Sequence, residues 1–409
     1  MNSNQISSTD MAVLSLLRNA LNNTAFELQG HVDWEKIGST ARKHMILPLV
    51  HKGAALLPAL QRPPEQLQKA WVNYTIGSVL RGDQLMNAQE EIIAQLAAAD
   101  IPCAVLKGTS VAALYPNPEL RSLGDIDLLV RREQCEDAVH VLKANGFHEH
   151  ESDHAFHIGF EKDNVYLELH YAVTEFPDSP AGKYIRNKLR DAIDRIKVIH
   201  WESHQMPVLS EPDQALALLL HMERHLVASG IGLKQLCDWH VFMHSLGENT
   251  LHTEVLPAID ACRLLQFARI ATRICVDYLG LDSKRHRWCE QAARDTADMF
   301  LADILSSGNI FSGDLERAAS SVFVKGEESS KRKATMLISA VRNLAASARK
   351  QFPVSTRVPV LLPFFCIYIP VRYWFRSMKG ARPKQSVRKI AAYAWKRKRL
   401  YRRLSLFKK

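Results

Sequence analysis

Residues 106–130, LKGTSVAALYPNPELRSLGDIDLLV, decide how the middle of the chain folds. The stretch overlaps a short apolar run, CAVLKG (103–108), that is stopped by glycine and predicts a buried strand. The hydroxyl residues Thr109 and Ser110 then open a helix that ends at a proline. DIDLLV (125–130) is a second apolar run and predicts a second strand.

Further predicted helices and strands follow this stretch along the chain. A helix is expected at 133–144, strands at 157–161 and 165–171 around the turn Lys162-Asp163-Asn164, and a strand at 197–202. The segments before and after have helical periodicity. The sequence therefore predicts an α+β fold with helices on one face of a sheet. Its expected parts are an N-terminal helical region (1–100), an α+β core (101–209), a C-terminal helical region (210–330) and a basic tail (331–409).

Asp125 and Asp127 carry the chemistry of the central stretch. Residues two apart on a strand face the same side, so the two carboxylates are expected to project together. Such close carboxylates repel each other unless a cation lies between them. Mg²⁺ prefers carboxylate oxygens together with substrate phosphates, and two such ions stabilise both oxygens of an in-line phosphoryl displacement. The pair therefore predicts a site for Mg²⁺ or Mn²⁺, and the alternative is a solvated strand end.

The residues around the pair supply the other groups that such a site needs. Gly108 lies in a turn that leads into a helix N-terminus, where backbone N–H groups bind phosphate and glycine allows close approach. Glu168 is expected on a neighbouring strand, either as a third carboxylate or as an exposed side chain, with His170 on its face. Lys107 and Arg121 either bind phosphate or neutralise the acids, and the sequence leaves both roles open.

Residues 106–130 resemble the polymerase-β nucleotidyltransferase superfamily, in which a glycine-hydroxyl turn precedes an acid-x-acid strand. They are more closely similar to the bacterial group of uncharacterised nucleotidyltransferases, as is LLLHMERHLVASGIGLKQLCDW (218–239). The features shared with that group are Lys107-Gly108, Tyr115, Arg121, Asp125, Asp127 and the triplet Glu168-Leu169-His170. The chain departs from the superfamily pattern in that Thr109 separates Gly108 from Ser110 and PNPEL (116–120) lengthens the segment before the acids.

The resemblance implies a polymerase-β-like core that transfers a nucleoside monophosphate from a nucleoside triphosphate to a hydroxyl or phosphate acceptor. Asp125, Asp127 and Glu168 would bind Mg²⁺ or Mn²⁺ and catalyse the reaction, and Glu168 can help to deprotonate the acceptor. The residues that would contact the nucleoside triphosphate are Lys107, Gly108, Ser110 and Arg121. The resemblance also suggests a place in surface-polysaccharide or peptide-tailoring systems.

The charge of the chain is divided between its body and its tail. Residues 331–409 carry 22 of the 53 lysine and arginine residues and no acidic residue, whereas residues 1–330 carry 31 basic and 43 acidic side chains. A basic tail of this kind predicts a polyanionic partner. The tail also contains the apolar run VPVLLPFFCIYIPV (358–371), which is shorter than the roughly 20 residues of a spanning helix.

An anionic membrane surface is the favoured partner of the tail, because aromatic and basic residues flank the apolar run. Nucleic acid is the alternative, since the same charges bind phosphates through counterion release. A third reading has the apolar run packed on the body.

The composition indicates the class of protein and the cell compartment in which it is expected. Hydrophobic residues make up 47% and charged residues 23% of the chain, which is typical of a globular protein. The seven cysteines form no CxxC pair, so a reducing cytoplasm is expected rather than a disulfide framework. No secretory signal is expected at the N-terminus. The chain is therefore predicted to be a cytoplasmic enzyme, peripheral on the inner face of the membrane. The alternatives are a non-catalytic membrane-associated adaptor with the same fold and a nucleic-acid-directed transferase.

Overall fold

The computed structural model describes residues 6–28, 30, 32–150, 156–174, 180–228 and 230–307, with parts of 345–368 and of 395–406. Most of the basic tail expected at 331–409 therefore lies outside the described residues. Contacts divide the chain into two compact units. The first comprises Met1–Met222 and Gly232–Asn309 with Lys409, and the second comprises Glu223–Ile231 and Ile310–Lys408.

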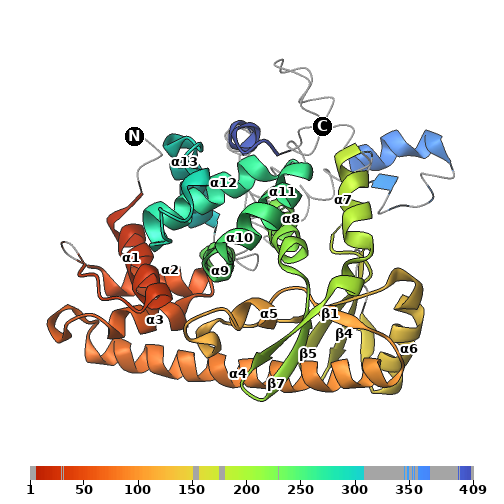
Figure 1. The fold of residues 1–409 in the computed structure, drawn as a ribbon, viewed down its shortest axis with the longest axis horizontal. Coiled ribbons are helices and arrows are strands. Elements are labelled where there is room, and N and C mark those ends of the chain that lie inside the picture. Colours follow the sequence, from red (N-terminus) through yellow and green to blue (C-terminus); the bar gives the residue numbers. More distant parts are fainter. Residues whose placement is uncertain are drawn as a thin grey trace. The chain divides into compact units, whose positions relative to one another are not determined.

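Among the described residues, four α-helices precede the first strand, which confirms the helical character predicted for this region. They are α1 (Ser8–Asn22), α2 (Trp34–Lys43), α3 (Leu47–Ala55) and α4 (Glu65–Ala98). Polar side chains cap the first two, since Ser7 accepts a hydrogen bond from the N–H of Asp10 and Asp33 accepts one from that of Lys36. With its 34 residues α4 is about 50 Å long and runs from the N-terminal helices along the sheet (Figure 1).

In the part of the chain that the structure describes, seven strands form one mixed sheet in the order β3-β4-β5-β2-β1-β7-β6. They are β1 (Cys103–Val105), β2 (Ile126–Val130), β3 (His148–His150), β4 (His157–Lys162), β5 (Val165–His170), β6 (Lys197–Trp201) and β7 (His204–Val208). The connecting helices are α5 (Thr109–Ala112), α6 (Cys135–Ala144) and α7 (Pro180–Arg190). β2 runs antiparallel to β1 and parallel to β5. The α+β class is confirmed, while β3, β7 and α7 were not anticipated from the sequence.

The two faces of the central strands differ in character. Ile126 and Leu128 of β2 and Leu167 and Leu169 of β5 belong to a buried core that α4 and α6 share. Successive side chains of a strand point to opposite faces, so the residues between them face the other way. The central strands therefore direct Asp127, Glu168 and His170 to the face opposite the one that α4 and α6 cover.

The chain is helical again after the sheet, as its periodicity predicts. The helices are α8 (Glu211–Ala228), α9 (Leu233–Ser245), α10 (Glu248–Thr250), α11 (Leu256–Ala261), α12 (Leu265–Ile274) and α13 (Arg294–Ser307). The hydroxyl of Ser210 donates to the carboxylate of Asp213 at the start of α8. In the first unit, the side-chain amide of Gln214 donates to the carbonyl of Leu106, which ties this helix to the end of β1.

In the second unit, the side chains of Arg397 and Tyr401 both donate to the carbonyl of Leu226. Large apolar side chains are exposed along 358–368, among them Val360, Phe364 and Ile367. None of the helices in the described part of the chain has both the length and the apolar character needed to cross a membrane.

Candidate active site

Three carboxylates converge where β2 and β5 run side by side. Asp127 and Glu168 are Cα partners in the parallel pairing, and Asp125 directly precedes β2. One oxygen of each carboxylate lies within 4.8 Å of the others. The side chain of Asp127 is 1% exposed, whereas those of Asp125 and Glu168 are 45% and 32% exposed. The position expected for Glu168, beside the pair and in the same sheet, is confirmed, and the trio faces solvent on one side.

Lys107 and His170 bring positive charge to these carboxylates. The amine of Lys107 lies 2.8 Å from Oδ1 of Asp127 and 3.9 Å from Oδ2 of Asp125. The Nε2 of His170 lies 3.1 Å from the same Oδ1 of Asp127 and 3.2 Å from Oε2 of Glu168. The basic side chains of Lys107 and His170 therefore lie among the three acidic side chains.

This arrangement shifts the ionisation of its members. Burial opposes the charge of Lys107, but the three carboxylates around it raise the pKa of its amine above the ordinary value. Burial alone would raise the pKa of Glu168, yet its hydrogen bond with His170 and the charge of Lys107 hold that pKa well below its usual range. In the same way, hydrogen bonds to Asp127 and Glu168 outweigh the burial of His170 and raise its pKa. Glu168 is consequently a charged carboxylate in the folded protein.

The turn after β1 has the backbone shape that its sequence predicts. Gly108 has φ +71° and ψ −108°, a conformation that side chains with a Cβ rarely adopt. A Cβ there would lie 3.8 Å from the carbonyl oxygen of Asp125 and 3.9 Å from Nη1 of Arg121, so the turn lies beside the acids. The hydroxyl of Thr109 donates to Gln89 of α4. That of Ser110 is buried, and no hydrogen-bond partner for it occurs among the described residues.

Arg121 pairs with an acid outside the central stretch. Its Nε and Nη2 donate to the two carboxylate oxygens of Asp238 on α9 at 3.0 and 2.8 Å, and Tyr115 donates to the same carboxylate at 2.7 Å. All three side chains are buried. Of the two roles that the sequence left open for Arg121, this geometry favours neutralisation of an acid, while its Nη1 remains beside the Gly108 turn.

Two further residues of the site were not singled out from the sequence as functional. The Nδ1 of His157 on β4 lies 3.6 Å from Oε2 of Glu168. Lys234, in the first turn of α9, reaches the carbonyl of Ser122 with its amine at 3.5 Å. The three-residue turn predicted for the hairpin shifts its register by one residue and does not pair His157 with His170. No local signal connects Lys234 with a segment more than a hundred residues earlier.

The residues present fit a divalent cation. Oδ2 of Asp127 is buried, and within the described part of the chain no hydrogen-bond donor reaches it. A buried carboxylate oxygen without a donor is costly unless a cation binds it. Three carboxylates with access to solvent suit Mg²⁺ or Mn²⁺, which take oxygen ligands.

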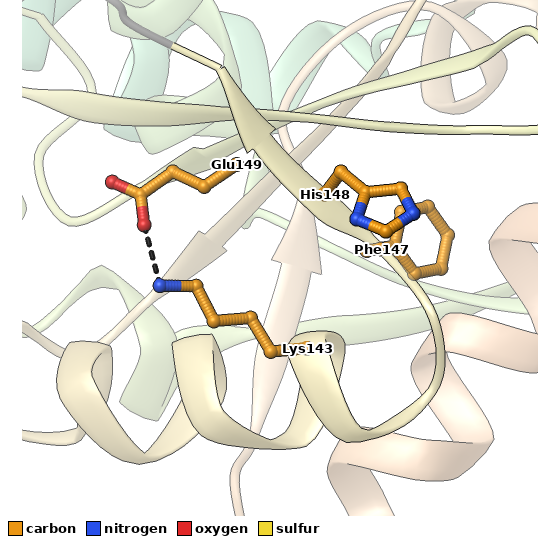
Figure 2. Close-up of a pocket in the computed structure, with 4 residues that line it drawn as sticks. All are labelled: Lys143, Phe147, His148 and Glu149. Carbon is orange, nitrogen blue, oxygen red and sulfur yellow. Dashed lines mark ion pairs between the residues drawn. The ribbon is translucent and has the colours of Figure 1, made fainter.

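A surface hollow elsewhere in the sheet region lacks these features. Figure 2 shows it lined by Lys143 of α6, by Phe147, and by His148 and Glu149 of β3. The only acid among them, Glu149, forms an ion pair with Lys143 at 2.7 Å. None of the site residues expected from the sequence lines this hollow.

Comparison with known proteins identifies a family for this arrangement. The family described as Uncharacterised nucleotidyltransferase matches residues 30–280 of the chain. That range includes the whole sheet, the three carboxylates and the Gly108 turn. No curated protein matches the chain.

Proposed function

The chain belongs to the family of uncharacterised nucleotidyltransferases, and we propose that it transfers a nucleoside monophosphate from a nucleoside triphosphate to a hydroxyl or phosphate acceptor. The observation that carries this proposal is the convergence of Asp125, Asp127 and Glu168 beside the Gly108 turn. Three carboxylates next to a turn that leads into a helix combine a cation site with a phosphate site.

Asp125, Asp127 and Glu168 would hold Mg²⁺ or Mn²⁺. A divalent ion bound there neutralises charge on the phosphates and polarises the oxygens of the transferred group. Glu168, the third carboxylate of the trio, would help to deprotonate an acceptor hydroxyl. The buried Oδ2 of Asp127 supports a ligand role for this residue in particular.

The groups proposed to bind the triphosphate lie on the Gly108 side of the trio. The backbone of Gly108 allows phosphate to come close, and the hydroxyl of Ser110 has no other partner among the described residues. Lys107 can pair with phosphate once Asp127 is neutralised in another way. Arg121 would bind the triphosphate through Nη1, because its Nε and Nη2 donate to Asp238.

The decisive experiment incubates the pure protein with each labelled nucleoside triphosphate and Mg²⁺, beside a cell extract that supplies acceptors. Wild-type protein should produce a labelled product, and Asp125→Asn should lower its formation by at least about a hundredfold. The fold should survive, because the side chain of Asp125 is 45% exposed.

Asp260→Asn, the same change at an exposed position of α11, serves as the matched control and should retain full activity. Turnover that persists in a folded Asp125→Asn variant would contradict the metal assignment. Wild-type protein that uses none of the triphosphates would instead favour the non-catalytic adaptor.

For residues 331–409 we propose attachment to an anionic membrane on the cytoplasmic side, with acceptors of the surface-polysaccharide or peptide-tailoring kind. The charge of this tail supports an anionic partner, because the segment contains 22 basic residues and no acidic residue. Exposed apolar side chains within 358–368 support a membrane over nucleic acid, because a phosphate backbone offers them nothing to pack against.

A further inference from the structure

Two imidazole rings meet next to the carboxylate trio. His157 of β4 and His170 of β5 are Cα partners in the antiparallel hairpin, and their ring centroids are 4.9 Å apart. Nε2 of His170 and Nδ1 of His157 lie 3.2 and 3.6 Å from the same oxygen of Glu168. One ligand atom of each of the three side chains lies within 4.8 Å of the others, so two imidazoles and one carboxylate converge on one point.

The two rings are buried and packed against an aromatic side chain. Both histidines are 2% exposed, and Phe156 packs against both of them at centroid distances of 4.7 and 5.8 Å. A third imidazole, that of His150 on β3, lies against Gly159, which is the β4 neighbour of Glu168. His157 and His150 therefore lie on the β4 and β3 side of Glu168, whereas His170 also contacts Asp127.

We propose that His157, Glu168 and His170 form a second cation site, which takes a divalent transition-metal ion. Mg²⁺ and Mn²⁺ prefer oxygen ligands, whereas imidazole nitrogens favour ions such as Co²⁺, Ni²⁺ and Zn²⁺. Two imidazoles with one carboxylate leave coordination positions open, as in catalytic rather than structural metal sites.

Glu168 belongs to both clusters, so it would bridge this ion and the one held by Asp125 and Asp127. The participation of the second ion in nucleotidyl transfer rests on the proposed function, but its binding to the protein does not. Binding can therefore be measured without nucleotide and independently of turnover.

Cobalt(II) is the appropriate probe, because its visible absorption reports ligand type and geometry, and thiolate ligands give it a separate charge-transfer band. Full-length protein is titrated with Co²⁺ in the presence of excess Mg²⁺. One Co²⁺ should bind with visible bands and without a thiolate band. His157→Phe removes one nitrogen ligand, retains an aromatic ring beside Phe156 and should weaken Co²⁺ binding by more than about tenfold.

Two variants serve as controls. Asp125→Asn alters the carboxylate trio alone and should retain Co²⁺ binding. His204→Gln removes a surface histidine that is also paired with a carboxylate, that of Glu90, and should retain it as well. If circular dichroism shows that His157→Phe does not fold, His157→Gln takes its place.

A folded His157 variant that binds Co²⁺ as the wild type does would overturn the proposal. A thiolate band, or a loss of binding in Asp125→Asn equal to that in the His157 variant, would also overturn it, since the ion would then lie elsewhere. Co²⁺ binding without any nucleotide turnover would support this site and count against the proposed function. Nucleotide turnover without Co²⁺ binding would support the proposed function and overturn this site.

Discussion

Lys234 keeps a positive charge in surroundings that oppose it. Burial, together with the neighbouring charge of Arg121, lowers the pKa of its amine to about 8. The carboxylates of Asp238 and Asp125 compensate only in part. A charge that is unfavourable for stability is often retained for function, and a triphosphate at the Gly108 turn would supply the missing negative charge.

Replacing Lys234 should therefore change the stability of the fold and the affinity for nucleoside triphosphate in opposite directions. Lys234→Met is expected to raise the free energy of unfolding by about 1–3 kcal/mol near pH 7, at about 1.4 kcal/mol per unit of pKa shift. It should also weaken binding of a non-hydrolysable nucleoside triphosphate by about tenfold or more. Denaturant titration and equilibrium binding measure the two effects.

The stability gained in Lys234→Met should depend on pH. The folded pKa of Lys234 lies below its ordinary value of 10.5, so the destabilisation is complete below about pH 8 and disappears as pH rises toward 10.5. The gain from Lys234→Met should shrink accordingly in alkaline buffer, and Lys234→Arg, which keeps the charge, should not show it. Unchanged triphosphate affinity in Lys234→Met would argue against a role in binding.

At the scale of elements, the carboxylate of Asp238 connects α9 with the segment that leads into β2. It accepts two hydrogen bonds from Arg121 and one from Tyr115, and the side chains involved are buried. Burial opposes the charge of Arg121, but Asp238 raises the pKa of the guanidinium above its ordinary value. The pair thus fixes the helix against the loop that presents Asp125.

Asp238→Asn should lower the free energy of unfolding by about 3–5 kcal/mol, because it leaves the charge of Arg121 buried without a counter-charge. Asp194→Asn is the matched control, since Asp194 pairs with Arg131 at the surface, where such a pair contributes at most about 1 kcal/mol. Denaturant unfolding of the two variants gives the comparison. A loss in Asp238→Asn no larger than that in Asp194→Asn would mean that the buried pair does not hold these elements together.

At the scale of the whole molecule, the basic tail and its apolar run predict two separable contributions to membrane binding. Each basic residue near an anionic leaflet contributes about 1 kcal/mol, and this attraction is screened by salt over about 8 Å. Insertion of apolar side chains is not screened. Val360, Phe364 and Ile367 are 81%, 61% and 66% exposed, so they are available for insertion.

Full-length protein should sediment with phosphatidylserine-containing vesicles and resist a moderate salt wash. The double variant Phe364→Ser/Ile367→Ser should lose the salt-resistant fraction, because the basic charge remains while the apolar contribution falls. Leu60→Ser, at a fully exposed apolar position of the first unit, controls for loss of surface hydrophobicity. Protein that ignores the vesicles but binds RNA tightly at low salt would replace the membrane with nucleic acid as partner.

The sequence by itself determined those features that depend on neighbours along the chain. The alternation of Ile126 and Leu128 with Asp127 fixes which face of β2 is apolar, because side chains of a strand alternate. The glycine turn at Gly108 follows in the same way from local backbone preferences. The carboxylate pair and the turn beside it are therefore predictable from the residues of one short segment.

The tertiary structure alone decided which distant segments meet. Glu168 lies beside Asp127 because β5 joins β2 in one parallel register, and a shift by one residue would turn its carboxylate to the other face. His157 reaches Glu168 because the hairpin turns on Asp163 and Asn164 only, one residue fewer than the turn predicted from the sequence. The pairing of Arg121 with Asp238 joins residues 117 positions apart. Such contacts depend on how whole elements pack, and no local preference of a residue encodes that packing.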